Sequence, residues 1–298
     1  MTTIAGRTRP TTFSGRLVAL INRFWLHIVL VFVSIAWLVP SMGLFVASLR
    51  TRAANSQSGW WTALWTGGWT TDNYTTVLQS ANLPPPGFAD NFVNTLIISI
   101  PGTLLPVAIA AVAAYAFAWM DFRGRDWIFL AVVALLVVPL QVTWVPVLQI
   151  LRELGLTQNF TGIWLAHSAY GLPFAIFLLR NFFADLPKDL FESARIDGAS
   201  ERMVFFRIVL PLSVPALASL AIFQFVWVWN DLMNALIYIQ DVDRFPLTVG
   251  IRSLLGQFGN EWHLLAAGAF ISMSMPLLVF FSLQRYFVRG ITAGAVKG

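Results

Sequence analysis

The segment Glu192-Ser-Ala-Arg-Ile-Asp-Gly-Ala-Ser200, which continues to Arg207-Ile-Val-Leu-Pro211, is a charged stretch inside a very apolar chain. Charges of both signs lie along it, which is typical of a solvated and structured segment, because a block of one sign repels itself and stays disordered. Leu186-Pro187 breaks the chain just before it. The pattern predicts a helix that starts near Leu190, with Asp189 as its cap.

Apolar residues at helical spacing predict one buried face for this helix, formed by Phe191, Ala194 and Ile196. Gly198 then permits a sharp bend, and a second short helix is predicted to run to Phe206. Composition alone is equally typical of an ordinary loop between membrane helices. The order of the residues is what distinguishes the two interpretations.

The composition of the whole chain indicates a helical membrane protein. Of its 298 residues, 57% are hydrophobic and 11% are charged, whereas soluble domains average about 25% charged residues. Cysteine is absent, so disulfide and thiolate chemistry are excluded. The net charge of +5 does not indicate nucleic-acid binding, because the arginines are not clustered with stacking aromatic residues.

Six long apolar runs have about the 20 residues needed to cross the hydrocarbon core of a bilayer. We predict an all-α membrane protein with transmembrane helices at about 24–47, 92–119, 127–148, 161–179, 212–238 and 264–286. The first run exceeds the apolar core of a secretory signal, so it is predicted to stay uncleaved.

The distribution of Lys and Arg predicts the orientation of these helices. Of the 19 basic residues, 14 fall on the face that carries both termini and five on the other, which places both termini in the cytoplasm. The predicted parts are a cytoplasmic segment 1–24, a transmembrane domain 25–290 and a cytoplasmic tail 291–298. The domain would contain a cytoplasmic loop 180–211 and extracytoplasmic loops 48–90 and 240–262.

The chain lacks the sequence motifs of ATP-hydrolysing and zinc-dependent enzymes. Its two lysines, Lys188 and Lys297, are followed by Asp and Gly, so there is no Gly-Lys-Ser/Thr of a phosphate-binding loop. The three histidines are far apart, and none begins a zinc-binding His-Glu-x-x-His. If ATP drives this protein, another polypeptide must hydrolyse it.

Polar residues at membrane depth are the candidates for a transport pathway. They are Gln224, Asn230, Asp231 and Asn234, in the fifth predicted helix. A carboxylate at the bilayer centre costs about 2.5–3.5 kcal/mol, so Asp231 should face the bundle or a wet cavity. Substrate contact and hydrogen bonding between helices are both open interpretations of these four residues.

The order of residues after Leu190 resembles the cytoplasmic "EAA" loop of ABC-transporter permeases. The positions that match best are Glu192, Ala194, Asp197, Gly198 and Ala199, followed by Ile208, Leu210 and Pro211. Ser193 stands where that family most often has Ala. The resemblance implies that this loop is the coupling helix, which sits in a cleft of a separate ATPase subunit and carries its motion into the membrane.

The resemblance extends over about residues 88–298 to permeases of the carbohydrate-uptake class, with type I ABC importer architecture. The matching stretches are Asn91–Leu96, Ala114–Ala118, Phe122–Arg125, Leu178–Phe183 and Trp229–Asp231. The most specific one, Gln284–Gly298, resembles the tail of the smaller permease subunit of maltose-type transporters.

That family implies a set of partners in a prokaryotic plasma membrane. They are a second, different permease, two ATPase subunits that bind ATP and Mg, and an extracytoplasmic sugar-binding protein. This chain itself would bind no cofactor. Loop 240–262 would reach the binding protein, with Gly250, Gly256 and Gly259 as candidate contacts, and the C-terminal tail would touch the ATPases.

The resemblance favours import of a di- or oligosaccharide, such as an α-glucoside of the maltose or trehalose type. Two alternatives stay open. One is an importer of the same architecture for a polyol or a glycerol phosphate ester. The other is an ion-driven secondary transporter with Asp231 as its proton site.

Overall fold

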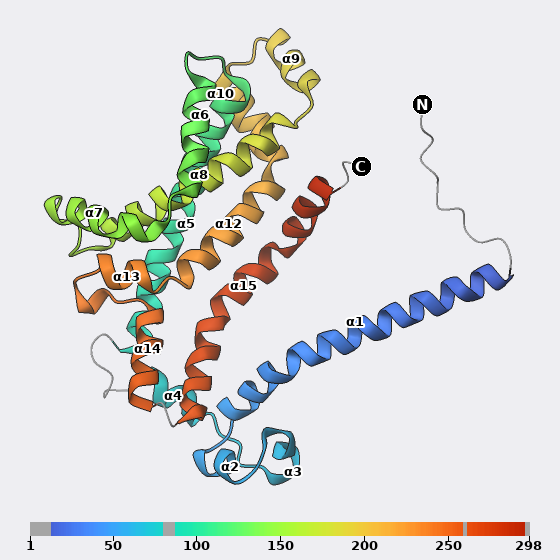
Figure 1. The fold of residues 1–298 in the computed structure, drawn as a ribbon, viewed down its shortest axis with the longest axis vertical. Helices are drawn as coiled ribbons and strands as arrows, with labels where there is room; N and C mark the ends of the chain where they lie inside the picture. The colour runs from blue at the N-terminus through green and yellow to red at the C-terminus, as the bar shows by residue number, and fades with distance from the viewer. Residues whose placement is uncertain (1–12, 80–86, 259–260, 296–298) are drawn as a thin grey trace.

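A computed structural model describes residues 13–79, 87–258 and 261–295, and within these residues the chain is helical without a β-strand (Figure 1). The long helices are α1 (Phe13–Ser48), α5 (Phe88–Trp119), α8 (Phe160–Ala184) and α15 (Trp262–Ala295). Shorter membrane helices are α6 (Arg125–Ala134), α7 (Leu140–Glu153) and α12 (Val214–Trp229), and the turn η2 (Leu135–Val137) extends α6. Between α8 and α12 lie α9 (Lys188–Ile196), α10 (Glu201–Val204), the π-helical turn η3 (Phe205–Val209) and α11 (Leu210–Leu212). The remaining elements are α2 (Arg52–Gln57), η1 (Trp60–Thr62), α3 (Ala63–Thr66) and α4 (Asp72–Leu78) between α1 and α5, and α13 (Met233–Tyr238), η4 (Val242–Arg244) and α14 (Leu247–Phe258) between α12 and α15.

Four helices of the described residues are long and apolar enough to cross a membrane without a break: Phe24–Ser48 in α1, and the spans in α5, α8 and α15. Two further spans are bent pairs. The segments Arg125–Val137 and Leu140–Glu153 meet at 105°, and Glu201–Leu212 meets Val214–Trp229 at 73°. If each bent pair is one span, the described residues contain the six spans that the sequence predicts.

The prediction of one helix over 127–148 and one over 212–238 is wrong, because each range is broken into two helices. Pro139 lacks a backbone N–H and holds Val138 in an extended conformation (φ −71°, ψ 119°), so the chain turns sharply there. In the second case α12 stops at Trp229. The carbonyl of Val226, near its end, also accepts a hydrogen bond from Asn230 Nδ2 at 2.8 Å.

The predicted extracytoplasmic loops also contain helices that sequence reasoning missed. Segment 240–262 includes α14, which buries Leu247 and Leu254 in one apolar cluster and Val249 in another. Segment 48–90 includes a small folded unit around Arg50, whose side chain is fully buried. The Arg50 guanidinium donates to backbone carbonyls and hydroxyl groups of residues 58–67. These hydrogen bonds hold the unit together in place of an apolar core.

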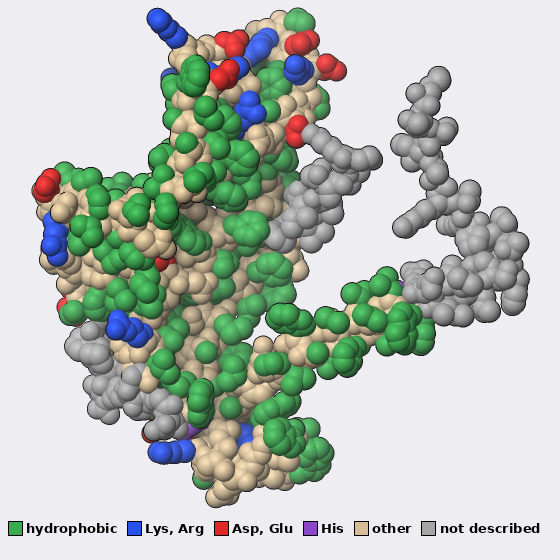
Figure 2. Space-filling model, in the orientation of Figure 1, with side chains coloured by type: hydrophobic (Ala, Val, Ile, Leu, Met, Phe, Trp, Pro, Cys, Tyr) green, Lys and Arg blue, Asp and Glu red, His purple; other side chains and the backbone are tan. Residues whose placement is uncertain are grey.

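Helix α5 lies at the centre of the bundle, where it packs chiefly against α8 and α12. Helix α1 diverges from the bundle (Figure 1). The C-terminal end of α1 meets α15, where the rings of Phe45 and Phe270 lie 5.2 Å apart. Figure 2 shows hydrophobic side chains along α1, and acidic and basic side chains gathered at the end of the molecule that contains α9 and α10.

Prolines interrupt the backbone hydrogen bonding of all four long helices without ending them: Pro40 in α1, Pro101 and Pro106 in α5, Pro173 in α8 and Pro276 in α15. Each removes the N–H that would bond the carbonyl four residues earlier, and an unpaired carbonyl is costly in hydrocarbon. For Pro101, Pro106 and Pro276, a side-chain N–H from a neighbouring helix donates to the freed carbonyl. The pairs are Trp164 Nε1 to Ile97 O (2.9 Å), Gln224 Nε2 to Gly102 O (3.1 Å) and Trp229 Nε1 to Ser272 O (3.1 Å).

Replacing Trp164 by Phe should destabilise the bundle, because the ring stays but the Ile97 carbonyl loses its donor. We expect a loss of about 1 kcal/mol, in the range of hydrogen bonds between membrane helices. Thermal unfolding of the purified protein in detergent measures it. Trp65→Phe is the matched control, because Trp65 is 80% exposed; equal loss in both variants would contradict the assignment.

Candidate functional site

The cytoplasmic helix α9 ends in a Schellman motif that needs glycine at one position. Gly198 has a left-handed backbone (φ +76°), and its N–H donates to Arg195 O at 3.1 Å. The next N–H, of Ala199, donates to Ala194 O at 2.9 Å. These two hydrogen bonds satisfy carbonyls that would otherwise be unpaired at the helix end. The spacing Asp-Gly-Ala therefore specifies the bend that the sequence predicts.

A second helix begins directly after this motif. Ser200 Oγ accepts from Met203 N at 3.4 Å, as an N-cap does, and α10 follows. The chain continues through the π-helical turn η3 and α11, and bends into α12 at Ser213. The predicted cap at Asp189 is wrong: Pro187 occupies the N-cap position of α9, and Asp189 lies in the first turn.

One aromatic side chain attaches α9 to the membrane bundle. Phe191 is 1% exposed, and its ring stacks on Trp119 of α5 with centroids 3.7 Å apart. Trp119 Nε1 in turn donates to Phe183 O of α8 at 2.9 Å. The segment formed by α9 and α10, called the coupling segment after the role that the resemblance implies, is therefore packed on the end of α5, which is itself bonded to α8.

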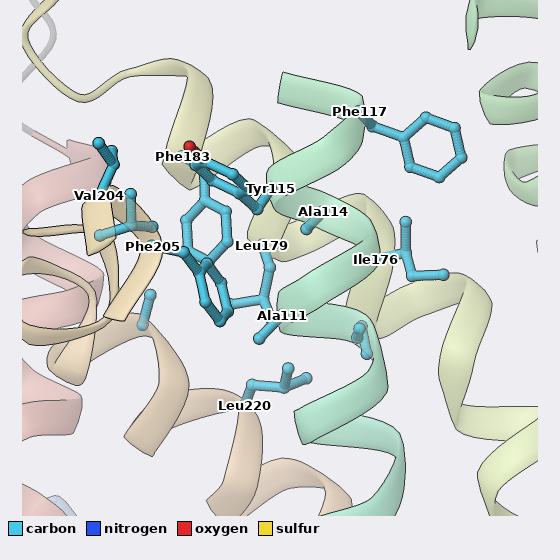
Figure 3. Close-up of a cluster of buried hydrophobic side chains, with 14 of the residues drawn as sticks. Ala111, Ala114, Tyr115, Phe117, Ile176, Leu179, Phe183, Val204, Phe205 and Leu220 are labelled. Atoms are coloured by element: carbon cyan, nitrogen blue, oxygen red, sulfur yellow. The ribbon is translucent and has the colours of Figure 1, made fainter. Parts of the chain in front are cut away.

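A carboxylate forms a second connection between this segment and α5, one helical turn of α5 further into the membrane. The two oxygens of Glu201 accept from different helices: Oε2 from the Tyr115 hydroxyl of α5, and Oε1 from Arg195 Nη2 of α9 at 3.1 Å. Tyr115 also contacts Phe205 of η3, with ring centroids 5.3 Å apart, within the buried cluster in Figure 3. Sequence reasoning missed Tyr115 and Glu201, because 86 residues separate them.

The face of the coupling segment that points away from the bundle is exposed. Glu192 and Asp197 lie there, together with Ile196, which is 86% exposed. The prediction that Ile196 shares the buried face of Phe191 and Ala194 is wrong, because five residues turn an α-helix well past the buried side. An apolar side chain held in solvent beside two carboxylates favours a protein contact.

We expect Ile196→Asp to weaken binding of a cytoplasmic partner while leaving the stability of this chain unchanged within about 0.5 kcal/mol, as for other surface changes. Phe191→Ala should instead detach the segment from α5, because it removes the buried ring that packs on that helix. Co-purification and limited proteolysis measure the two effects. If both variants retained full partner binding, the exposed face would not be an interface.

A cavity of about 430 Å³ lies within the membrane part, between the bent pair α6–α7 and helices α8 and α12. Most of its lining is apolar, and three side chains bring polar atoms: Tyr170, Gln224 and Trp227. Of the predicted pathway residues, Gln224 is thus at the cavity, although its amide also donates to Gly102 O. Sequence reasoning missed Tyr170 and Trp227, which carry no charge and look like core aromatic residues.

Two of the other predicted pathway residues belong to a buried polar cluster. Asp231 Oδ2 lies 3.6 Å from His167 Nε2 of α8, and the Asp231 carbonyl accepts from Thr248 Oγ1 of α14 at 2.8 Å. Asn234 Oδ1 accepts from Trp144 Nε1 of α7 at 3.0 Å. These contacts connect the break between α12 and α13 to three other helices.

The remaining predicted residues lie elsewhere. Asn230 is exposed, and its side chain bonds back to Val226 O of its own helix. Gly250 is buried where α14 crosses α5, and a Cβ there would lie 2.6 Å from Asn91 Oδ1. Gly256 lies in α14, and Gly259 lies outside the described residues.

An ion pair orders the chain just before α14. Arg244 Nε donates to Asp241 Oδ2 at 2.7 Å, and this hydrogen bond holds the pKa of the Asp241 carboxyl below its ordinary value. The Arg244 guanidinium also lies 5.2 Å from the ring centre of Phe160 in α8. These two contacts of Arg244 therefore order the exposed backbone just before α14.

Comparison with known proteins identifies the family. Residues 107–293, which contain the coupling segment and the cavity, match the model of the "binding-protein-dependent transport system inner membrane component". The chain belongs to this family. It is a multi-pass inner-membrane permease, and the prediction of an ABC importer permease of the carbohydrate-uptake class is confirmed. The family is one of transport permeases and not of enzymes.

Individual relatives cover most of the chain. An osmoprotective compounds uptake permease of Synechocystis sp. is 49% identical over 100% of both chains. An alpha-glucoside transport system permease of Rhizobium meliloti is 47% identical over 87% of this chain and 69% of its own length. A trehalose/maltose transport system permease of Thermococcus litoralis is 37% identical over 77% of this chain and 82% of its own.

Solved structures show the same fold. A chain of a bacterial ABC transporter that imports the acidic polysaccharide alginate superposes with a TM-score of 0.61 at 18% identity, covering 91% of this chain and 99% of that one. A chain of the alginate transporter in complex with a substrate-bound periplasmic protein gives 0.58 at 19% identity, covering 90% and 96%. The type I importer architecture that the sequence predicts is confirmed.

Proposed function

We propose that this permease forms one half of the translocation pathway of an ATP-driven importer for a neutral sugar or glycoside. The observation that carries the proposal is the coupling segment. Its bend at Gly198 is specified by backbone hydrogen bonds, it packs on α5 through Phe191, and it presents Glu192 and Ile196 to the cytoplasm. A rigid exposed segment of this kind can transmit the conformational change of another subunit to the membrane helices.

The chemistry of the cavity supports a neutral substrate. None of the twelve side chains that line it carries a formal charge, and its hydroxyl, amide and indole N–H groups suit a polyhydroxylated molecule. A glycerol phosphate ester would require a cation, which this lining does not offer. The relatives named for alpha-glucosides and trehalose/maltose support a di- or oligosaccharide. The relative named for osmoprotective compounds supports a polyol or glycoside osmolyte as the second candidate.

The proposed assembly has a second, different permease, two ATPase subunits and an extracytoplasmic binding protein. ATP and Mg bind in the ATPase subunits, and this chain holds no cofactor. The ATPase subunits would bind α9 at the surface that contains Glu192 and Asp197. The binding protein would dock at the opposite end of the bundle, on the segment from residue 240 to α14, where Val242 and Leu255 are exposed.

In the proposed cycle, closure of the ATPase pair displaces the coupling segment. Because α9 is packed on α5, which is itself bonded to α8, the displacement moves those helices as a unit. The lining of the cavity comes from η2, α7, α8 and α12, so the relative motion of these elements would open it to one side of the membrane and then to the other.

Glu192→Lys should uncouple transport, because it reverses the charge at the exposed face of α9 without touching the packing of Phe191. We expect normal membrane insertion and loss of ATPase activity from the complex purified through a tag on this chain. Pull-down in mild detergent, followed by an ATPase assay and sugar uptake, measures it. Uptake at the unaltered rate in the Lys variant would refute the coupling role.

Asp231→Asn separates this proposal from an ion-driven carrier. In the importer Asp231 only joins helices, so Asn, which keeps the shape and the acceptor for Asn234 N, should leave uptake within about threefold. In an ion-driven carrier the loss of the carboxyl would abolish uptake. Uptake energised by ATP in vesicles without an ion gradient is the deciding measurement.

A further inference from the structure

Helix α5 holds functional segments at both of its ends. At the cytoplasmic end, Tyr115 and Trp119, one turn apart, contact Glu201 and Phe191 of the coupling segment. Tyr115 and Phe191 are buried, whereas the Glu201 side chain is 44% exposed, and the two contacts fix α9 and α10 to a single helix. Any displacement of the coupling segment must therefore displace the end of α5 or break these contacts.

At the extracytoplasmic end the same helix holds the segment that leads into α14. Three buried side chains of α5, one turn apart or adjacent, bond the backbone of residues 243–247. The bonds are Asn91 Nδ2 to Phe245 O (2.7 Å), Asn94 Nδ2 to Asp243 O (2.8 Å) and to Phe245 O (3.2 Å), and Leu247 N to Thr95 Oγ1 (2.6 Å). About 150 residues of sequence separate the partners, so these bonds place the segment directly on α5.

Between these ends α5 is one continuous helix. Asn94 and Tyr115 are 21 residues apart, a distance of about 32 Å along a helix. The two prolines lie within this interval, and the carbonyls that they free are bonded by Trp164 and Gln224. The donors come from α8 and α12, so neighbouring helices support α5 where its own hydrogen bonds are missing.

We propose that α5 connects the two faces of the importer: docking of the binding protein on residues 240–258 is transmitted through α5 to the coupling segment, with Asn94 and Tyr115 as positioning residues at its two ends. This inference rests on the proposed function. A connection of this kind requires two arrangements of one packed element, each favoured by one partner. Because α5 bonds backbone atoms at one end and a carboxylate at the other, single side chains test each end separately.

The test uses the complete assembly, purified with its ATPase and second permease subunits and reconstituted in lipid. ATPase activity is measured without and with saturating sugar-loaded binding protein. Tyr115→Phe removes only the hydroxyl that bonds Glu201, and Asn94→Leu removes only the amide. We expect each to lower the stimulation by the binding protein about fivefold, the lower range of allosteric couplings. Basal hydrolysis is measured for each variant, and stimulation is expressed as the ratio of the stimulated to the basal rate.

Tyr74→Phe is the matched control. It removes a partly buried tyrosine hydroxyl that bonds Ser48 Oγ at 2.7 Å; its ring packs on the cluster that contains Leu247 and Leu254 of α14, and the ring stays in the variant. We expect its stimulation to equal that of the unaltered assembly. Thermal unfolding of the three variants checks that they are equally stable, and a loss of stimulation in the control as large as in Tyr115→Phe would overturn the assignment.

The double variant separates one shared route from two independent effects. If Asn94 and Tyr115 act in series through α5, the double variant should lose no more stimulation than the more severe single variant. Independent effects would multiply to about 25-fold, as expected for distant uncoupled sites. Multiplied losses, or full stimulation in both single variants, would refute the connection through α5 while leaving the importer function standing. An unaltered assembly without stimulated ATPase activity would instead refute the proposed function.

Discussion

The pairing of backbone carbonyls that prolines leave free inside the membrane is the constraint on which the bundle depends. Hydrocarbon supplies no hydrogen-bond donor, so a proline within a spanning helix costs less where a neighbouring helix supplies one. Trp164, Gln224 and Trp229 do so for α5 and α15. These bonds fix which helices lie beside one another and at what depth. They also explain why Gln224, a polar residue in an apolar helix, is buried.

The same side chain shows how structure and transport share residues. Gln224 lines the cavity and supports α5, and it packs so closely on Gly171 that a Cβ there would lie 2.6 Å from its amide nitrogen. The polar cluster around Asp231 joins helices in a similar way. The polar side chains of this membrane domain therefore hold neighbouring helices together, and in the proposed importer the indole and phenol groups of the cavity would contact the solute.

Local signals in the sequence were sufficient for the coupling segment and insufficient for its attachments. The order Asp-Gly-Ala-Ser predicts a bend, because a Schellman motif and an N-cap depend on neighbouring residues alone. The contact of Tyr115 with Glu201 depends on how α5 and α10 pack, which no local pattern encodes. Pro139 was visible, but hydropathy cannot tell a tolerated proline from one that turns the chain by 105°. Helix α14 was missed because its glycines and arginine resemble a loop.

The hydrogen bonds to the carbonyls that prolines free also impose an order on the biogenesis of the chain. The long helix α1 is exposed between Phe24 and Met42, so lipid can surround it as soon as it is synthesised. Helix α5 follows, yet the carbonyl of Gly102 must wait for Gln224, which is made 122 residues later. Until α8 and α12 enter the bilayer, α5 carries unpaired carbonyls in its middle. A ribosome that stalls within this interval leaves a chain with polar backbone exposed to hydrocarbon, which is the kind of defect that membrane quality control can recognise.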